Sequence, residues 1–283
     1  MIRRPPRSTQ GVSSAASDVY KRQMLTQMIH RDWNRASVII WSIGNETPFS
    51  DARMEFMIDL KETAEGLDSS RLISAALLSG SVEQFRSLTY FLAKEGLKHS
   101  FVSDYEKAIF KQIVSKLQPL YGSMDAFRIN IKDPLAEHLD IIAYNEYFGW
   151  YYVTFFADQM MIAEGTLRKL MFEVMPNIKI SSSFDKPIHI SEFGAGAKFG
   201  NHTNKIWSEQ YQAKLYEHQL EMLSKNPQIQ GISPWVFKDF RAMLSPLPGI
   251  QDFYNRKGLI DENGNKKEAF KVLADFYENK WSK

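Results

Sequence analysis

The sequence lacks several residues and patterns that define common classes of protein. None of its 283 residues is cysteine, which excludes a disulfide framework and a thiolate metal site and leaves the cellular compartment open. No run of 18 apolar residues occurs, so no membrane-spanning helix is predicted. The six histidines show no paired ligand spacing, no Gly-rich phosphate loop follows a predicted strand, and no Gly-x-Ser-x-Gly elbow is present. We therefore predict neither a metal site nor a cofactor, and no serine hydrolase.

The positive charge of the chain is concentrated at its N-terminus. The formal net charge is +2, and residues 1–23 contain five basic residues against one acidic residue, so the remainder is slightly acidic. This balance gives no case for binding nucleic acid. Residues 1–23 lack apolar periodicity and contain Pro5-Pro6, which predicts disorder. They have the composition of a transit peptide, but residues 13–23 resemble translated sequencing-adapter DNA, and we favour a non-native tail.

Residues 24–283 alternate between short β-branched apolar runs and helical patterns, which is typical of an α/β fold with a parallel sheet. With 44% hydrophobic residues, this part of the chain can bury one large core. The connection from residue 77 to 140 contains two helical patterns, near 82–94 and 105–117, and we expect it to cover the functional site. The sequence predicts five strands, at residues 37–43, 71–76, 141–145, 188–191 and 229–235.

Two of the predicted strands end in a glutamate. One is followed by Gly44-Asn45-Glu46, and another continues into Ser191-Glu192-Phe193-Gly194. Parallel α/β folds place ligands and chemistry at the carboxyl ends of their strands. A single glutamate there is most simply a solvent-exposed charge, but two in matching contexts, with aromatic residues nearby, fit a reaction that uses a pair of carboxylates. His189, on the opposite face of its strand from Glu192, is interpreted as structural.

Three segments together resemble the catalytic barrel of glycoside hydrolase family 2, which includes β-galactosidases, β-glucuronidases and β-mannosidases. They are residues 43–46, 145–151 and 190–194, which occur in the family's order and with compatible spacing. The resemblance covers about residues 24–277 and is more specific for the family than for the sugar. In that family the acid follows the fourth barrel strand and the nucleophile follows the seventh. The resemblance therefore implies an incomplete (β/α)8 TIM barrel with strands four to eight, the C-terminal part of a longer enzyme.

The resemblance also implies a role for individual residues. Glu46 would be the acid/base and Glu192 the nucleophile of a retaining mechanism, with their carboxyl groups about 5–5.5 Å apart. Asn45 would hydrogen-bond the sugar 2-hydroxyl; the alternative is that it caps the following turn. Tyr147 would hydrogen-bond the nucleophile; the alternative is a half-buried aromatic residue. Trp235 would form a platform for the sugar, unless it belongs to the core. Trp150 and Tyr151 have weaker support as residues of an outer pocket.

The identity of the sugar depends on one further segment. Asn255-Arg256-Lys257-Gly258 resembles the motif in which Asn255 and Lys257 would hold the carboxylate of glucuronate, as in β-glucuronidases of the family. The alternative is a basic turn that exposes its charges to solvent. Some β-galactosidases of the family use magnesium, but no ligand for it can be matched here.

These observations predict a retaining exo-β-glycosidase that acts on terminal non-reducing β-linked sugars and most resembles a β-glucuronidase. β-Galactosidase is the alternative within the family. The alternative of another class is a truncated, non-catalytic carbohydrate-binding barrel fragment, because missing strands remove part of the shell that supports a site. We expect a β-glycoside as the substrate, no nucleic acid or membrane partner, and leave open a homo-oligomer of the full-length enzyme.

Overall fold

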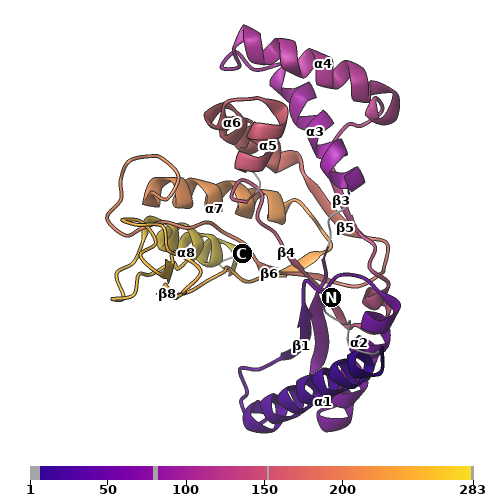
Figure 1. Cartoon of the computed structure of the whole chain (residues 1–283). Helices are drawn as coiled ribbons and strands as arrows, with labels where there is room; N and C mark the ends of the chain where they lie inside the picture. The colour runs from indigo at the N-terminus through magenta and orange to yellow at the C-terminus, as the bar shows by residue number, and fades with distance from the viewer. Residues whose placement is uncertain (1–6, 79–81, 152, 282–283) are drawn as a thin grey trace, which may run out of the picture. The chain divides into compact units, whose positions relative to one another are not determined.

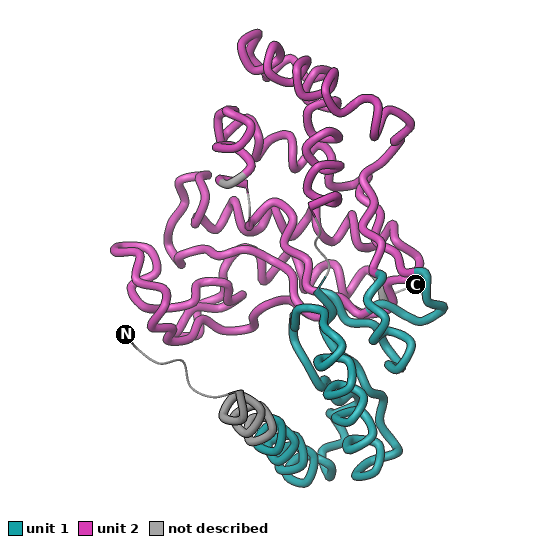
Figure 2. Tube along the Cα trace, turned by 45° about the vertical axis from the view of Figure 1, so that its right-hand side comes forward, with its two compact units in different colours: residues 1–78, 132–144, 183–188 teal, residues 79–131, 145–182, 189–283 magenta. Residues whose placement is uncertain are grey.

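The computed structural model describes residues 7–78, 82–151 and 153–281, and the chain divides into two compact units (Figure 2). Unit 1 comprises residues 1–78, 132–144 and 183–188; unit 2 comprises residues 79–131, 145–182 and 189–283. Among the described residues, no helix combines the length and apolar content needed to cross a membrane.

Unit 1 is built on parallel strands. These are β1 (Ile40–Asn45), β2 (Leu72–Ala76) and β4 (Ile141–Asn145, of which the last residue belongs to unit 2), in the order β1-β2-β4. Trp41 pairs with Ile73, and Ala75 pairs with Ile142. All four side chains are buried, as expected for apolar runs in a parallel sheet. The 3-10 helix η1 (Pro134–His138) also belongs to this unit.

Two helices of unit 1, α1 (Arg7–Asp32) and α2 (Asp51–Leu67), pack against each other (Figure 1). Helix α1 covers most of the segment for which the sequence predicted disorder up to residue 23; residues 1–6 lie outside the described residues. The physical reason is local: residues 7–32 contain no proline, and their Ala, Gln, Lys, Arg, Met and Leu residues have good helix propensity. Residues 24–32 supply the nucleus from which such a helix extends. That residues 1–23 are a non-native tail stays a prediction.

Unit 2 contains the end of β4 and two further strands, β6 (Ile188–Glu192, whose first residue belongs to unit 1) and β7 (Ile229–Ile232). Strand β6 lies next to β7, and hydrogen bonding continues beyond the end of β7, where Trp235 N–H donates to the carbonyl of Phe193 at 2.9 Å. On the other side of β6, Glu146 N–H donates to the carbonyl of Glu192 at 2.8 Å. The end of β6 is therefore held by hydrogen bonds from both sides.

The remaining elements of unit 2 form several packed pairs. Helix α3 (Val82–Gly96) packs against α4 (Asp104–Tyr121), and α7 (Glu209–Ser224) packs against α8 (Glu268–Trp281). Strand β3 (Arg128–Ile131) pairs in parallel with β5 (Lys179–Ser182). The other elements are α5 (Val153–Met160), α6 (Glu164–Val174), the 3-10 helix η2 (Met175–Asn177) and the antiparallel pair β8 (Phe240–Arg241) and β9 (Tyr254–Asn255).

All five strands predicted from the sequence are present as β1, β2, β4, β6 and β7, and the two helical patterns of the long connection form α3 and α4. The short strands β3, β5, β8 and β9 were not predicted. The α/β class and the parallel sheet are thus confirmed, whereas the assignment to barrel strands four to eight stays a prediction.

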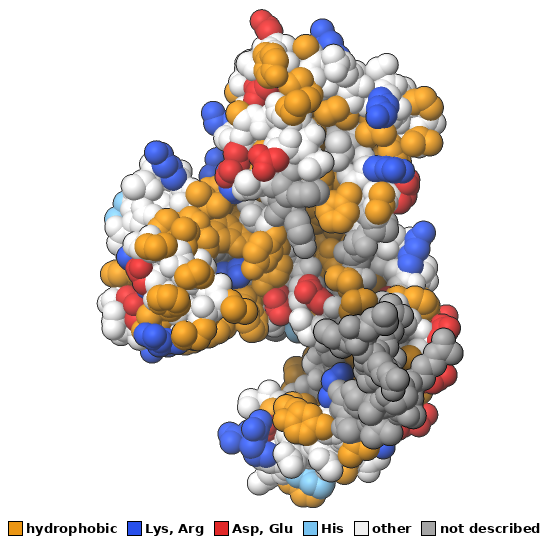
Figure 3. All heavy atoms as spheres, in the orientation of Figure 1, with side chains coloured by type: hydrophobic (Ala, Val, Ile, Leu, Met, Phe, Trp, Pro, Cys, Tyr) orange, Lys and Arg blue, Asp and Glu red, His pale blue; other side chains and the backbone are white. Residues whose placement is uncertain are grey.

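Helices α3 and α4 leave apolar side chains at the surface, which Figure 3 shows as hydrophobic patches over this pair. A groove of about 850 Å³ lies among α3, α4 and α5, and its lining includes the exposed residues Val82 and Leu120. The cation Lys116 also lines it. That this connection covers the functional site stays a prediction.

Candidate active site

Glu46 follows the last residue of β1 in unit 1. The register of β1 against β2 shifts between Ser42 and Asn45, and such irregularities occur where a strand re-aims its last side chains. Glu46 has a positive φ of 49°, while its N–H donates to the carbonyl of Ala76 at 2.9 Å. A left-handed conformation is uncommon for a residue other than glycine and is often found at functional sites. The side chains of Asn45 and Glu46 are both exposed at this strand end.

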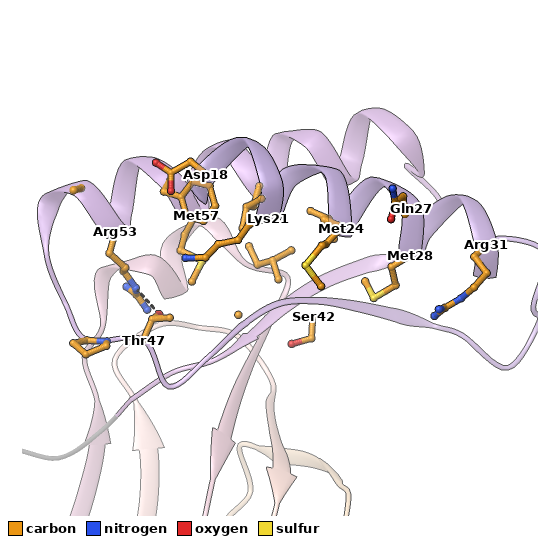
Figure 4. Close-up of a pocket in the computed structure, with 17 residues that line it drawn as sticks. Asp18, Lys21, Met24, Gln27, Met28, Arg31, Ser42, Thr47, Arg53 and Met57 are labelled. Carbon is orange, nitrogen blue, oxygen red and sulfur yellow. Dashed lines mark hydrogen bonds between the residues drawn. The ribbon is translucent and has the colours of Figure 1, made fainter. Parts of the chain in front are cut away.

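A separate groove in unit 1 lies between α1, β1 and α2, with a volume of about 980 Å³ (Figure 4). Met24 and Met28 of α1 and Met57 of α2 line it, so much of its surface is flexible and apolar. At one end Arg53 donates to the hydroxyl of Thr47 at 3.0 Å. None of the predicted site residues lines this groove. It has the character of a packing surface rather than of a chemical site.

Glu192 is the last residue of β6 in unit 2, and its side chain is held by a tyrosine. The hydroxyl of Tyr147 donates to Oε2 of Glu192 at 2.7 Å. Burial and the neighbouring Glu192 carboxylate raise the pKa of Tyr147, so its hydroxyl stays protonated and able to donate. The hydrogen bond between these two residues, predicted from the motifs, is present across 45 positions of sequence.

Lys257 lies beside the same tyrosine. Its Nζ is 5.8 Å from the ring centroid of Tyr147 and 4.9 Å from that of Tyr151, distances typical of cation–π contacts. The side chain of Asn255 accepts a hydrogen bond from Lys257 N–H at 3.1 Å, which stabilises the turn. The Asn-x-Lys motif and the Tyr147–Glu192 pair are thus brought together in unit 2, with a cation beside the tyrosine that binds the carboxylate.

The aromatic residues predicted from the sequence occupy different environments. Trp235 is half-buried beyond the end of β7, with its ring edge-to-face to Phe240 at 6.3 Å between centroids. Trp150 is buried and packs edge-to-face against Trp207 at 4.8 Å, whereas Tyr151 is exposed. Tyr151 is therefore the better placed of that pair to meet a ligand.

His189 has the properties of a structural residue. It is half-buried, and its Nε2 lies 2.9 Å from the hydroxyl of Ser233. Burial lowers the pKa of its imidazole, which favours the neutral ring.

Two polar residues near Glu192 were not assigned from the sequence. Asn145 is buried at the end of β4, and its Oδ1 accepts a hydrogen bond from the hydroxyl of Ser191 at 2.7 Å. Glu146 is fully buried and accepts a hydrogen bond from the N–H of Phe148. Burial raises the pKa of Glu146 to about 8. Both residues belong to the Asn145-Glu146-Tyr147 motif at the end of a predicted strand. Buried polar side chains need hydrogen-bond partners, so this position could have identified them as residues of the site.

The structure thus brings Glu192, Tyr147, Asn255 and Lys257 together in unit 2, with Trp235 on the adjoining strand end. Asn45 and Glu46 lie at a strand end in unit 1. Within the described part of the chain, no group of three or more histidine, aspartate or glutamate side chains is arranged to hold a metal ion.

An α/β fold with a parallel sheet, glutamates at two of its strand ends, and a tyrosine that holds one of them are features also found in hydrolases that cleave glycosidic bonds with a pair of carboxylates. Residues 9–280 match the family described as glycosyl hydrolases family 2, TIM barrel domain. The chain belongs to this family.

Several relatives carry names that refer to uronic acids. The chain is 26% identical over 274 residues to a putative β-glucuronidase of Formosa agariphila, covering 93% of this chain and 27% of that protein. It is 24% identical to a β-glucuronidase of Streptococcus agalactiae, covering 88% of this chain and 33% of that protein. The chain therefore spans about a third of the length of these curated relatives or less.

Solved structures share the fold. A β-glucuronidase from Ruminococcus gnavus in complex with D-glucuronic acid has a TM-score of 0.60 at 20% identity, covering 94% of this chain and 37% of that chain. A family 2 β-galacturonidase from Eisenbergiella tayi bound to galacturonate has a TM-score of 0.58 at 23% identity, covering 91% of this chain and 36% of that chain. Identities this low support the fold alone.

Proposed function

We propose that this chain is the catalytic part of a retaining exo-β-glycosidase that removes terminal β-linked uronic acids, with a β-glucuronide as the favoured substrate. Glu46 acts as the acid/base, and Glu192 acts as the nucleophile. The observation that carries the uronic acid is the position of Lys257, whose ammonium lies beside the tyrosine that binds Glu192. An ammonium group and an amide donor suit a sugar carboxylate, which a neutral galactoside lacks.

The reaction follows in two displacements. Glu46, protonated, gives its proton to the glycosidic oxygen as a carboxylate oxygen of Glu192 attacks the anomeric carbon, so the bond to the leaving group breaks and a glycosyl ester forms. Glu46, now ionised, removes a proton from water, whose oxygen attacks the same carbon and releases Glu192. Tyr147 donates its hydrogen bond to Glu192 and thereby favours the ionised nucleophile.

The names of the relatives support a sugar acid rather than a neutral sugar. Glucuronic acid and galacturonate, the ligands of the two solved structures, both carry a carboxylate, and they differ in the configuration of a hydroxyl group. β-Galacturonide is therefore the second candidate substrate. The β-galactoside alternative lacks the charge that Lys257 would meet.

The test uses the longest protein that the gene encodes, with p-nitrophenyl β-D-glucuronide, β-D-galacturonide and β-D-galactoside as substrates. We expect cleavage of a uronide, with the β-anomer of the free sugar appearing first in the proton NMR spectrum. Glu46→Gln and Glu192→Gln should each lower kcat by at least about 100-fold. Glu217→Gln, on the exposed face of α7, is the matched control and should leave kcat unchanged.

Four outcomes would contradict the proposal in different parts. Appearance of the α-anomer first would exclude a retaining mechanism. Preference for the galactoside would remove the role assigned to Lys257. Substantial activity in both glutamine variants would exclude the carboxylate pair, and a folded wild-type protein without any hydrolysis would favour the non-catalytic carbohydrate-binding fragment.

A further inference from the structure

The turn that carries Lys257 is anchored by a buried ion pair. Lys267, just before α8, and Asp239, just before β8, both have fully buried side chains. Nζ of Lys267 lies 2.8 and 2.9 Å from the two carboxylate oxygens of Asp239. Charged side chains are seldom buried in this way unless they are paired, because each of them loses favourable hydration when it leaves water.

The same ion pair reaches the backbone of the turn. Nζ of Lys267 also donates to the carbonyl of Arg256 at 3.1 Å and to that of Ala197 at 2.7 Å. Oδ1 of Asp239 accepts a hydrogen bond from the N–H of Gly258 at 2.7 Å. The residues on both sides of Lys257 are thus held by one buried pair.

Further contacts complete the anchorage. The carbonyl of Arg256 also accepts from Ala197 N–H at 2.9 Å, and the carbonyl of Lys257 accepts from Val236 N–H at 3.1 Å. A Cβ atom at Gly258 would lie 2.3 Å from the backbone nitrogen of Asp239, so the close approach requires glycine. The backbone of Lys257 therefore has little freedom, although its ammonium reaches outward to Tyr151 and Tyr147.

We propose that Lys267 and Asp239 are positioning residues that set the preference of the site for a sugar acid. They fix the backbone on both sides of Lys257, so its ammonium stays beside Tyr147 and meets the substrate carboxylate without first being ordered. This inference rests on the proposed uronide specificity and assigns part of it to residues that do not touch the substrate. A pre-ordered cation binds an anion more tightly, because less side-chain and backbone entropy is lost on binding.

Asp239 also pairs with Arg256, whose Nη1 lies 3.3 Å from its Oδ2. Removal of Asp239 alone would leave Lys267 buried without a carboxylate, and removal of Lys267 alone would leave Asp239 with the longer of its two ion pairs, so the test changes both. Lys267→Met/Asp239→Asn leaves the net charge unchanged and retains an oxygen to accept the Gly258 N–H. It loses both lysine–carbonyl bonds and the ion pair between Asp239 and Arg256, while Arg256 keeps its ion pair with Glu262. Lys271→Met/Asp275→Asn makes the same changes in an exposed ion pair of α8 and is the matched control. Thermal melting establishes that each variant is folded.

The first readout is the ratio of kcat/KM for p-nitrophenyl β-D-glucuronide to that for the β-D-glucoside, which lacks the carboxylate. In the Lys267→Met/Asp239→Asn variant we expect this ratio to fall by at least about tenfold, mainly through KM, because the change acts on binding of the charge. The surface variant should keep the wild-type ratio. In the Lys257→Met background the added pair of substitutions should cause no further loss, since residues that act through one another are not additive.

The second readout needs no turnover: calorimetry compares the affinity for D-glucuronate with that for D-glucose. Gly258→Ala, which displaces the same backbone without changing any charge, should reduce the preference for glucuronate in the same direction as the double variant. A wild-type protein without that preference would overturn both the uronide proposal and this inference. A wild-type protein with the preference, and a folded double variant that retains it, would overturn this inference alone. The inference would also be overturned if Lys267→Met/Asp239→Asn reduced the preference for the sugar acid equally in the wild-type protein and in the Lys257→Met variant.

Discussion

Glu146 offers a sharp test of the electrostatics next to the candidate nucleophile. Its carboxyl group is completely buried and accepts a hydrogen bond from Phe148 N–H, while the buried amide of Gln219 donates to the carbonyl of Phe148 at 3.2 Å. Glu146→Gln keeps an oxygen to accept the hydrogen bond and nearly the same volume, but it cannot ionise. The two proteins should therefore differ in how their stability depends on pH.

The size of the difference follows from the pKa values. Burial raises the pKa of Glu146 from 4.5 to about 8 in the folded state. Below pH 4.5 the carboxyl is protonated in both states, so it contributes no pH dependence there. Between the two values the unfolded chain releases the proton that the folded chain retains, and the free energy of unfolding falls by up to about 1.4 kcal/mol per pH unit. The total loss approaches about 5 kcal/mol above pH 8.

Urea denaturation followed by tryptophan fluorescence, at pH values from about 5 to 9, measures this difference directly. We expect the Glu146→Gln variant to gain stability relative to the wild type as the pH rises. Because glutamine does not titrate, any effect of the new amide group on the free energy of unfolding is the same at every pH. Glu217→Gln, at an exposed position of α7, should follow the wild-type curve. A difference between wild type and Glu146→Gln that stays flat across this range would refute the reasoning.

Three other substitutions probe the site and the packing around it. Tyr147→Phe removes a hydrogen bond to a charged group, worth about 1.5–3 kcal/mol, so kcat/KM for the uronide should fall about 10- to 100-fold; unchanged rates would contradict its role. Ser103→Ala removes the capping box that Ser103 forms with Glu106 at the start of α4 and should cost about 0.5–2 kcal/mol of stability in urea denaturation. Phe110→Ala should cost about 3–5 kcal/mol in the same assay, because the fully buried ring of Phe110 fills the space against Gly96 of α3. An effect of either stability variant below about 0.5 kcal/mol would contradict these contacts.

The strands of the parallel sheet could be predicted from the sequence because their signal is local. Runs such as residues 37–43 and 188–191 are β-branched and apolar, and each forms the strand that they predict. Burial is confined to alternate residues, Trp41 and Ile43 in the first run and Ile188 and Ile190 in the second, whereas Ile39 is exposed, so burial of the whole first run is wrong. Strands β3 and β5 were missed partly because each has only four residues, too few for a periodicity to stand out, although β7 of the same length was predicted. The first half of helix α1 was missed because the composition of residues 1–23 was taken to indicate disorder. Once the following turns of the helix form, the residues before them add to it at little cost.

The sequence by itself determined the α/β class, the family resemblance and the identity of the strand-end glutamates, because all of these reside in short contiguous motifs. Only the tertiary structure decided which charged residues are buried. Lys266-Lys267-Glu268 reads as a solvated run, yet Lys267 is enclosed and paired with Asp239, 28 positions earlier in the chain. Lys257 likewise meets Tyr147 across 110 positions of sequence. The environment of a charge depends on partners that the fold brings from distant segments, and no local pattern of residues contains that information.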